Sequence, residues 1–174
     1  MLRLDLPPKI HAEVERLSAE GSSLLEGGEH KRAVAKFEAA LQLLPEPRSR
    51  WSAATWLYTT IGDAEIELGR LKKARDALRN AATSPEAAAN PYPQLRYGQV
   101  LADLGERDAA ADPLAKAAMI GGVTLFAMAD RLDLLEIVDT KLRPPEGYAS
   151  WIEYAESMDW QERENPEDSE SATA

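Results

Sequence analysis

The feature that most constrains the fold of this chain is a pattern 34 residues long that three segments share. The copies are VERLSAEGSSLLEGGEHKRAVAKFEAALQLLPEP, TWLYTTIGDAEIELGRLKKARDALRNAATSPEAA and PYPQLRYGQVLADLGERDAAADPLAKAAMIGGVT, at residues 14–47, 55–88 and 91–124. They align without internal gaps, so insertions of seven and two residues fall between copies. Such a period indicates one supersecondary unit that stacks on its neighbours.

Small residues occupy the same four positions in each copy. Gly at position eight predicts that two helices approach closely, with the Ala at position twenty facing it, and Gly at position fifteen predicts a turn with a left-handed backbone. Ala at position twenty-seven lets the next unit stack tightly, and position twenty-four carries a larger apolar side chain. In chain order these residues are Gly21, Gly62 and Gly98; Gly28, Gly69 and Gly105; Ala33, Ala74 and Ala110; Ala40, Ala81 and Ala117; and Phe37, Leu78 and Leu114.

The composition also favours helices. Ala (29 residues) and Leu (22) dominate, whereas Val, Ile and Phe together number 13, and this balance predicts an all-α protein. We expect helices near residues 9–27, 30–44, 49–68, 71–83, 91–104 and 107–120. The seven-residue insertion RSRWSAA is predicted to lengthen the third helix, with Ser49 as its N-cap.

Residues 125–158 are predicted to cap the last unit and to complete a single domain at residues 1–158. Within 125–142, apolar residues recur at spacings of three and four, which predicts one amphipathic helix: these residues are Leu125, Met128, Leu132, Leu135 and Val138. A short helix is expected around Trp151. Residues 159–174 contain six acidic residues and one Arg, and we predict that they form a disordered acidic tail.

The unit length and its four small positions resemble the tetratricopeptide repeat (TPR). The resemblance implies a right-handed helical solenoid of three helix-pair repeats plus C-terminal capping helices, in which the first helices form a concave wall. Positions two, five, nine, twelve and thirteen of each repeat are expected to point out of this wall, Leu95 among them. The candidate partner-binding residues are Glu15, Ser22, Glu26, Trp56, Thr59, Asp63, Glu67, Tyr92, Arg96, Gln99 and Asp103.

The predicted wall is acidic and contains two large aromatic side chains, Trp56 and Tyr92. Opposite charge speeds encounter and aromatic residues supply much of the contact energy at interfaces, so the wall suits a basic protein or peptide partner. Two alternatives remain open at this point. In the first, the carboxylates only solvate a helix face, and in the second, Trp56 belongs to the core.

The net charge and the residue types present argue against several other classes of function. A net charge of −10 argues against nucleic acid or an anionic membrane surface as the partner. With no Cys and only His11 and His30 as histidines, we expect no catalytic site, no metal and no cofactor. The longest uncharged run, residues 117–129, is too short to cross a bilayer, and the start of the chain has no apolar signal segment. A cytoplasmic location is therefore expected.

Three further stretches, LPEPRSRWSAATWLYTTIGDAEIELG, NPYPQLRYGQVLADLG and LFAMADRLDLLEIVDTKLRPP, resemble a group of short bacterial TPR proteins that are often encoded beside polymorphic toxins. This resemblance implies an immunity protein, which binds and neutralises one cognate toxin inside the producing cell. The sequence LFAMADRLDLL departs from the more acidic, proline-containing stretch expected of that group. A general TPR scaffold or assembly adaptor, unrelated to toxins, is the alternative.

Overall fold

The structure is a computed structural model that describes residues 6–158, and within this range the protein is all-α, as predicted. The predicted acidic tail, residues 159–174, lies outside the described residues. The α-helices are α1 (Pro8–Glu26), α2 (His30–Leu43), α3 (Ser52–Glu67), α4 (Leu71–Ala82), α5 (Pro91–Asp103), α6 (Arg107–Met128), α7 (Leu135–Val138) and α8 (Trp151–Glu156). Short 3₁₀ turns are η1 (Arg48–Arg50), η2 (Pro85–Ala88) and η3 (Leu132–Leu134).

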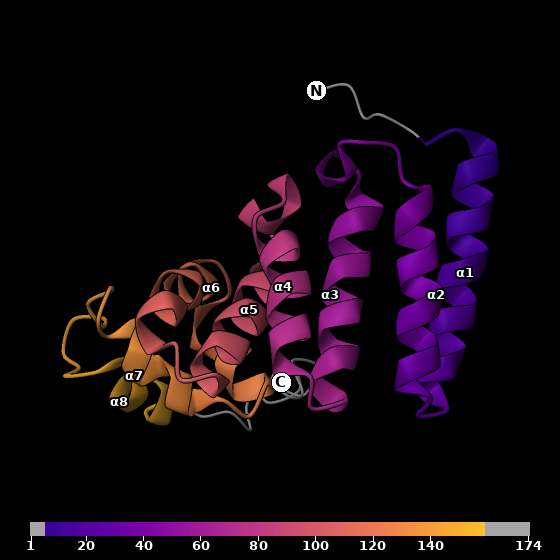
Figure 1. Cartoon of the computed structure of the whole chain (residues 1–174). Coiled ribbons are helices and arrows are strands. Elements are labelled where there is room, and N and C mark those ends of the chain that lie inside the picture. Colours follow the sequence, from indigo (N-terminus) through magenta and orange to yellow (C-terminus); the bar gives the residue numbers. More distant parts are fainter. Residues whose placement is uncertain (1–5, 159–174) are drawn as a thin grey trace, which may run out of the picture.

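Consecutive helices pack against one another along the whole described chain. Helices α1 to α4 stand side by side, α5 and α6 continue the row, and α7 and α8 lie at its far end (Figure 1). Helices α3 and α5, the first helices of the second and third units, also contact each other directly. The result is a helical-repeat arrangement in which each pair covers the apolar side of the next.

The close approach predicted at position eight is confirmed. A Cβ atom built on Gly62 would lie 2.4 Å from Leu78 Cγ, and one on Gly21 would lie 2.5 Å from Phe37 Cε1. The nearest side chain is therefore the apolar residue at position twenty-four, whereas the sequence analysis expected the Ala at position twenty. That Ala is nevertheless fully buried in each unit, as Ala33, Ala74 and Ala110.

The turn predicted at position fifteen is also confirmed. Gly28, Gly69 and Gly105 all follow the end of a first helix and have φ angles of 73°, 68° and 80°. These values lie in the left-handed region, where a side chain would be strained. Each turn lets the second helix of the unit return against the first.

The insertion between the first two units differs from its prediction. Residues 48–50 form the separate turn η1, and α3 begins at Ser52, so Ser49 is not its N-cap. The residue before α3 is Trp51, which has an extended backbone (φ −100°, ψ 128°). Its indole N–H donates a hydrogen bond to Pro45 O at 2.8 Å, and this contact fixes the turn in place of a longer helix.

The predicted single cap helix is also wrong. Helix α6 continues to Met128 through a kink at Gly122 (φ 62°, ψ −173°), and residues 132–138 form η3 and α7. The helix ends because Asp130 is left-handed (φ 53°) while the Arg131 N–H donates to Phe126 O at 2.9 Å. Met128, predicted to be on the apolar stripe, is 84% exposed.

The final short helix is confirmed as α8. The hydroxyl of Ser150 accepts a hydrogen bond from the Glu153 N–H at 3.0 Å, which caps the helix N-terminus. The Trp151 indole N–H donates to Leu142 O at 3.1 Å, and the Trp151 backbone N–H donates to Asp139 Oδ1 at 3.0 Å. These bonds attach α8 to the segment that follows α7.

Candidate functional site

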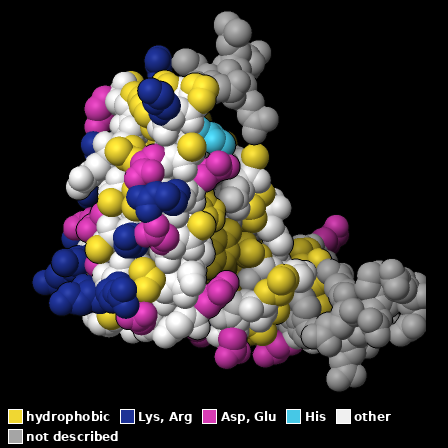
Figure 2. All heavy atoms as spheres, turned by 90° about the vertical axis from the view of Figure 1, so that its right-hand side faces the viewer, with side chains coloured by type: hydrophobic (Ala, Val, Ile, Leu, Met, Phe, Trp, Pro, Cys, Tyr) yellow, Lys and Arg dark blue, Asp and Glu magenta, His cyan; other side chains and the backbone are white. Residues whose placement is uncertain are grey.

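A cavity of about 740 Å³ lies between α1, α3 and the start of α5, and we call it the groove. Its lining residues are Leu6, His11, Val14, Glu15, Ser18, Ser52, Ala53, Thr55, Trp56, Thr59, Thr60, Asp63, Glu86, Asn90 and Tyr92. Figure 2 shows a hollow whose floor is apolar and whose margin carries acidic side chains. Residues of α1, α3 and α5, the first helices of the three units, therefore lie together in the groove.

Both predicted aromatic anchors line the groove and are half exposed. Trp56 is 46% exposed and Tyr92 is 41% exposed. One edge of the Trp56 ring system packs against Phe37 in a T-shaped contact with a centroid separation of 5.6 Å. Trp56 thus touches the core while the rest of its surface remains available in the groove.

Asp63 is the centre of a polar network that joins α3 to α5. Arg96 Nε donates to Asp63 Oδ1 at 2.6 Å, and the Tyr92 hydroxyl donates to Asp63 Oδ2 at 3.0 Å. Arg96 Nη1 also donates to Gln99 Oε1 at 2.7 Å. Two predicted site residues, Arg96 and Tyr92, therefore bond directly to this carboxylate, and a third, Gln99, is connected to it through Arg96.

Burial acts on the acid–base properties of this network. Burial raises the pKa of the Asp63 carboxyl, while the Arg96 guanidinium beside it lowers that pKa and offsets part of the rise. Burial, with the neighbouring Asp63 charge, raises the pKa of the Tyr92 hydroxyl to about 12. The Asp63 charge is already paired with Arg96, which weakens its ability to attract a cation from a partner.

The predicted residues at position thirteen lie at the ends of the first helices. Glu26 ends α1, Glu67 ends α3 and Asp103 ends α5, and all three are exposed. Asp103 forms an ion pair with Arg131 Nη2 at 3.0 Å, whereas Glu26 and Glu67 form no salt bridge within residues 6–158. None of the three lines the groove.

The remaining predicted residues divide between groove and core. Glu15 lines the groove, and its carboxylate lies 3.3 Å from His11 Nδ1. Thr59 also lines it but is only 8% exposed, and its hydroxyl donates to Thr55 O at 2.8 Å. Ser22 is half-buried and lies outside the groove lining. Leu95, expected to point outward, is fully buried in the core.

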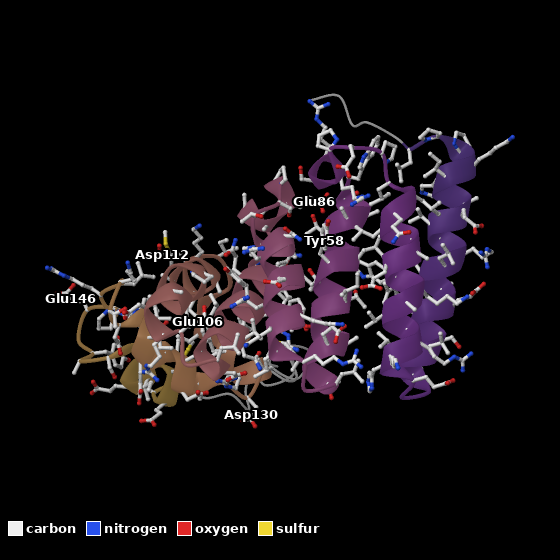
Figure 3. The ribbon with its side chains drawn as sticks, viewed as in Figure 1. Tyr58, Glu86, Glu106, Asp112, Asp130 and Glu146 are labelled. Carbon is white, nitrogen blue, oxygen red and sulfur yellow. The ribbon has the colours of Figure 1, made fainter. Side chains whose placement is uncertain are left out.

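Several groove residues were not among the predicted partner-binding residues. Glu86 and Asn90 come from the connection between α4 and α5, His11 precedes the first repeat, and Thr55 is the first position of the second repeat. Glu86 lies at the end of the molecule where α3 begins (Figure 3). Repeat positions could not indicate these residues, because none of the four occupies a wall position: His11 and Asn90 lie outside the repeats, and Thr55 and Glu86 are at positions one and thirty-two of the second repeat.

Charge is distributed unevenly between first and second helices. Helix α3 contains three acidic residues and no Lys or Arg, whereas α4 contains four Lys or Arg residues and one Asp. Of the three α3 carboxylates, only Asp63 lines the groove, and it is paired with Arg96. Glu65 is buried and paired with Arg70, whereas Glu67 is exposed near the end of the helix. The second-helix side of the same unit is basic.

The part of the chain that the structure describes contains neither a metal-binding cluster nor a membrane-spanning helix. In residues 6–158, no group of three or more His, Cys, Asp or Glu side chains is arranged to hold a metal ion. No helix in that range combines the length and apolar character needed to cross a membrane. No protein-family model matches the chain, and no curated protein is similar enough in sequence to count as a relative.

Proposed function

We propose that this chain is a TPR-like solenoid that binds a polypeptide partner in the groove. The observation that carries the proposal is the presence of two half-exposed aromatic side chains, Trp56 and Tyr92, in one cavity bounded by three successive first helices. Large aromatic side chains at a concave surface are typical anchors of protein interfaces. The proposed activity is binding, with no catalytic step and no cofactor.

The charge of the groove favours a basic partner. The groove contains the carboxylates of Glu15 and Glu86 in addition to the paired Asp63, and Glu67 lies further along α3. A basic segment approaching this side meets complementary charge, which speeds association at low salt. The aromatic side chains then slow dissociation, because they are removed from water when the complex forms.

A more specific proposal is that the partner is a toxin and that the chain is an immunity protein. Its support is the sequence resemblance to short bacterial TPR proteins found beside toxins, together with an acidic groove suited to toxins that act on anionic targets. The general scaffold remains the competing function. A captured partner that is toxic when expressed alone, and harmless when expressed with this chain, would favour immunity, whereas a non-toxic partner would favour the scaffold.

The test is capture of the partner with the full chain from the native cell, followed by binding kinetics. Trp56→Ala should mainly raise the dissociation rate, and Glu67→Lys should mainly lower the association rate, with an effect that shrinks as salt rises beyond about 0.1 M. The matched control is Glu38→Lys on α2, an exposed charge on the second-helix side. Equal losses from Glu38→Lys and Glu67→Lys, or association independent of salt, would place the binding surface elsewhere.

A further inference from the structure

One buried hydroxyl in the wall of the groove has no hydrogen-bonding partner. Thr55 is 4% exposed and lines the groove, and its Oγ1 atom has neither a hydrogen-bond partner nor appreciable contact with solvent. Buried polar groups are paired in the great majority of cases, because an unpaired one loses its bonds to water without replacement. Its presence in a groove therefore calls for an explanation.

The neighbouring threonines of α3 show how such hydroxyls are normally satisfied. Thr59 Oγ1 donates to Thr55 O at 2.8 Å, and Thr60 Oγ1 donates to Trp56 O at 3.0 Å. The equivalent acceptor for Thr55 is the carbonyl of Trp51, which instead receives the Ala54 backbone N–H at 2.9 Å. Of the three threonines, Thr55 alone keeps an unused hydroxyl.

A bound ligand can reach this hydroxyl. Threonine in a helix has two accessible χ1 rotamers, and a change of rotamer moves its oxygen by about 120° to another staggered position. Thr55 lines the groove beside Trp56, so a rotamer that turns the oxygen to the groove side would let it bond to an occupant. A new hydrogen bond would then offset the desolvation of the hydroxyl in the free protein.

The hydroxyl also indicates the conformation of the occupant. In a bound helix the backbone N–H and C=O groups are already bonded to one another, so none is free for Thr55 except at the helix ends. An extended segment offers unpaired backbone groups along its whole length. The two carboxylates of the groove that lack an Arg or Lys partner, Glu15 and Glu86, favour a cationic side chain on that segment.

From these observations we infer that the groove binds an extended polypeptide segment which bonds to the Thr55 hydroxyl and places a Lys or Arg side chain beside Glu86. This inference rests on the proposed function and makes it more specific. Trp56 would cover the aliphatic part of the basic side chain or an adjacent apolar residue. Thr55 is then a specificity-determining residue, because a segment without a suitably placed polar group leaves its hydroxyl unpaired.

The test begins with selection of random dodecapeptides displayed on phage against the full chain. The most enriched peptide, synthesised with a fluorescent label, is the probe for titration by fluorescence anisotropy. We expect the enriched sequences to share at least one Lys or Arg close to an apolar residue. Failure to enrich any peptide, or enrichment of sequences without Lys and Arg, would overturn the inference.

The decisive variants differ by one hydroxyl. Thr55→Val should weaken binding of the probe by about three- to tenfold, the loss of one hydrogen bond, while the melting temperature stays equal or rises. Thr55→Ser retains the hydroxyl and should bind within about threefold of the parent. Thr60→Val is the matched control, because its hydroxyl also belongs to a groove residue but is bonded within the helix, and it should leave affinity within about twofold.

A second pair of variants tests the predicted positive charge of the bound segment. Glu86→Gln should weaken binding about two- to fivefold at low salt and less at high salt, whereas Glu38→Gln on α2 should have no effect. Unchanged affinity in both Thr55→Val and Glu86→Gln would overturn the inference. If Trp56→Ala still weakened binding of the same probe in that case, the proposed function would stand and only the inference about the extended segment would fail. If Trp56→Ala also had no effect, the proposed function and the inference would both fail.

Discussion

Gly62→Ala is the substitution whose cost can be derived most directly from the structure. The added Cβ would lie 2.4 Å from Leu78 Cγ and 2.7 Å from Leu78 Cδ2, whereas carbon atoms pack best at about 3.5–4.0 Å. Leu78 is fully buried, so it cannot move aside into solvent. Either the side chain or the two helices must shift.

Two opposing effects decide the magnitude for Gly62→Ala. Ala favours a helix over Gly by about 0.5–1 kcal/mol, and overpacking costs about 1–3 kcal/mol. Overpacking is the larger effect, so we expect a net loss of about 1–2 kcal/mol in the free energy of unfolding. For a chain of this size, that loss lowers the melting temperature by about 2–8 °C.

Differential scanning calorimetry or circular dichroism can measure this change, and two further variants make the result specific. Leu78→Ala alone should cost about 2–5 kcal/mol, but Gly62→Ala combined with Leu78→Ala should cost less than the sum, because the new methyl enters the vacated space. Gly27→Ala is the control: its Cβ would meet only backbone oxygens at 3.6 Å, so stability should be unchanged or higher. Additive losses, or a Gly62→Ala variant as stable as the parent, would refute the close helix approach.

Three other substitutions test separate contacts. Ala74→Leu introduces a large side chain at a fully buried position and should lower unfolding free energy by about 1–3 kcal/mol in denaturant titration; an unchanged midpoint would contradict the packing of α4. Trp51→Phe removes the indole bond to Pro45 O and should cost about 0.5–1.5 kcal/mol by thermal unfolding, with Trp56→Phe, which has no such bond, as the comparison. Arg96→Met removes the partner of Asp63, and we expect a loss of about 1–3 kcal/mol at pH 7. Because burial raises the pKa of Asp63 and Arg96 opposes that rise, the Arg96→Met deficit should be smallest in acid, where the carboxyl is protonated in the folded and the unfolded protein, and should grow as pH rises through the raised pKa. A deficit that is constant from pH 4 to pH 7, measured by denaturant titration, would contradict the contact.

The groove shows where prediction from the repeat succeeds and where it stops. The repeat positions predicted Glu15, Trp56 and Tyr92 for one wall, and all three line the cavity, because helical periodicity determines which side chains share a face. Helical periodicity could not indicate that Asp63 is paired with Arg96, 33 residues away. That pairing depends on the offset between α3 and α5, which no local pattern encodes.

The sequence by itself determined the three repeat units, each a pair of helices joined by a turn. The repeated glycines mark the turns and close approaches, and apolar residues recurring at spacings of three and four define the helices, since these properties depend on backbone geometry and local spacing. Only the tertiary structure decided the cap and the groove. The Asp63–Arg96 pair, the groove between α1, α3 and α5, and the hydrogen bond that joins Trp151 to Asp139 depend on contacts made after stacking. Side chains acquire such partners from elements distant in sequence, so the physical reason is the packing of whole helices rather than the preference of any one segment.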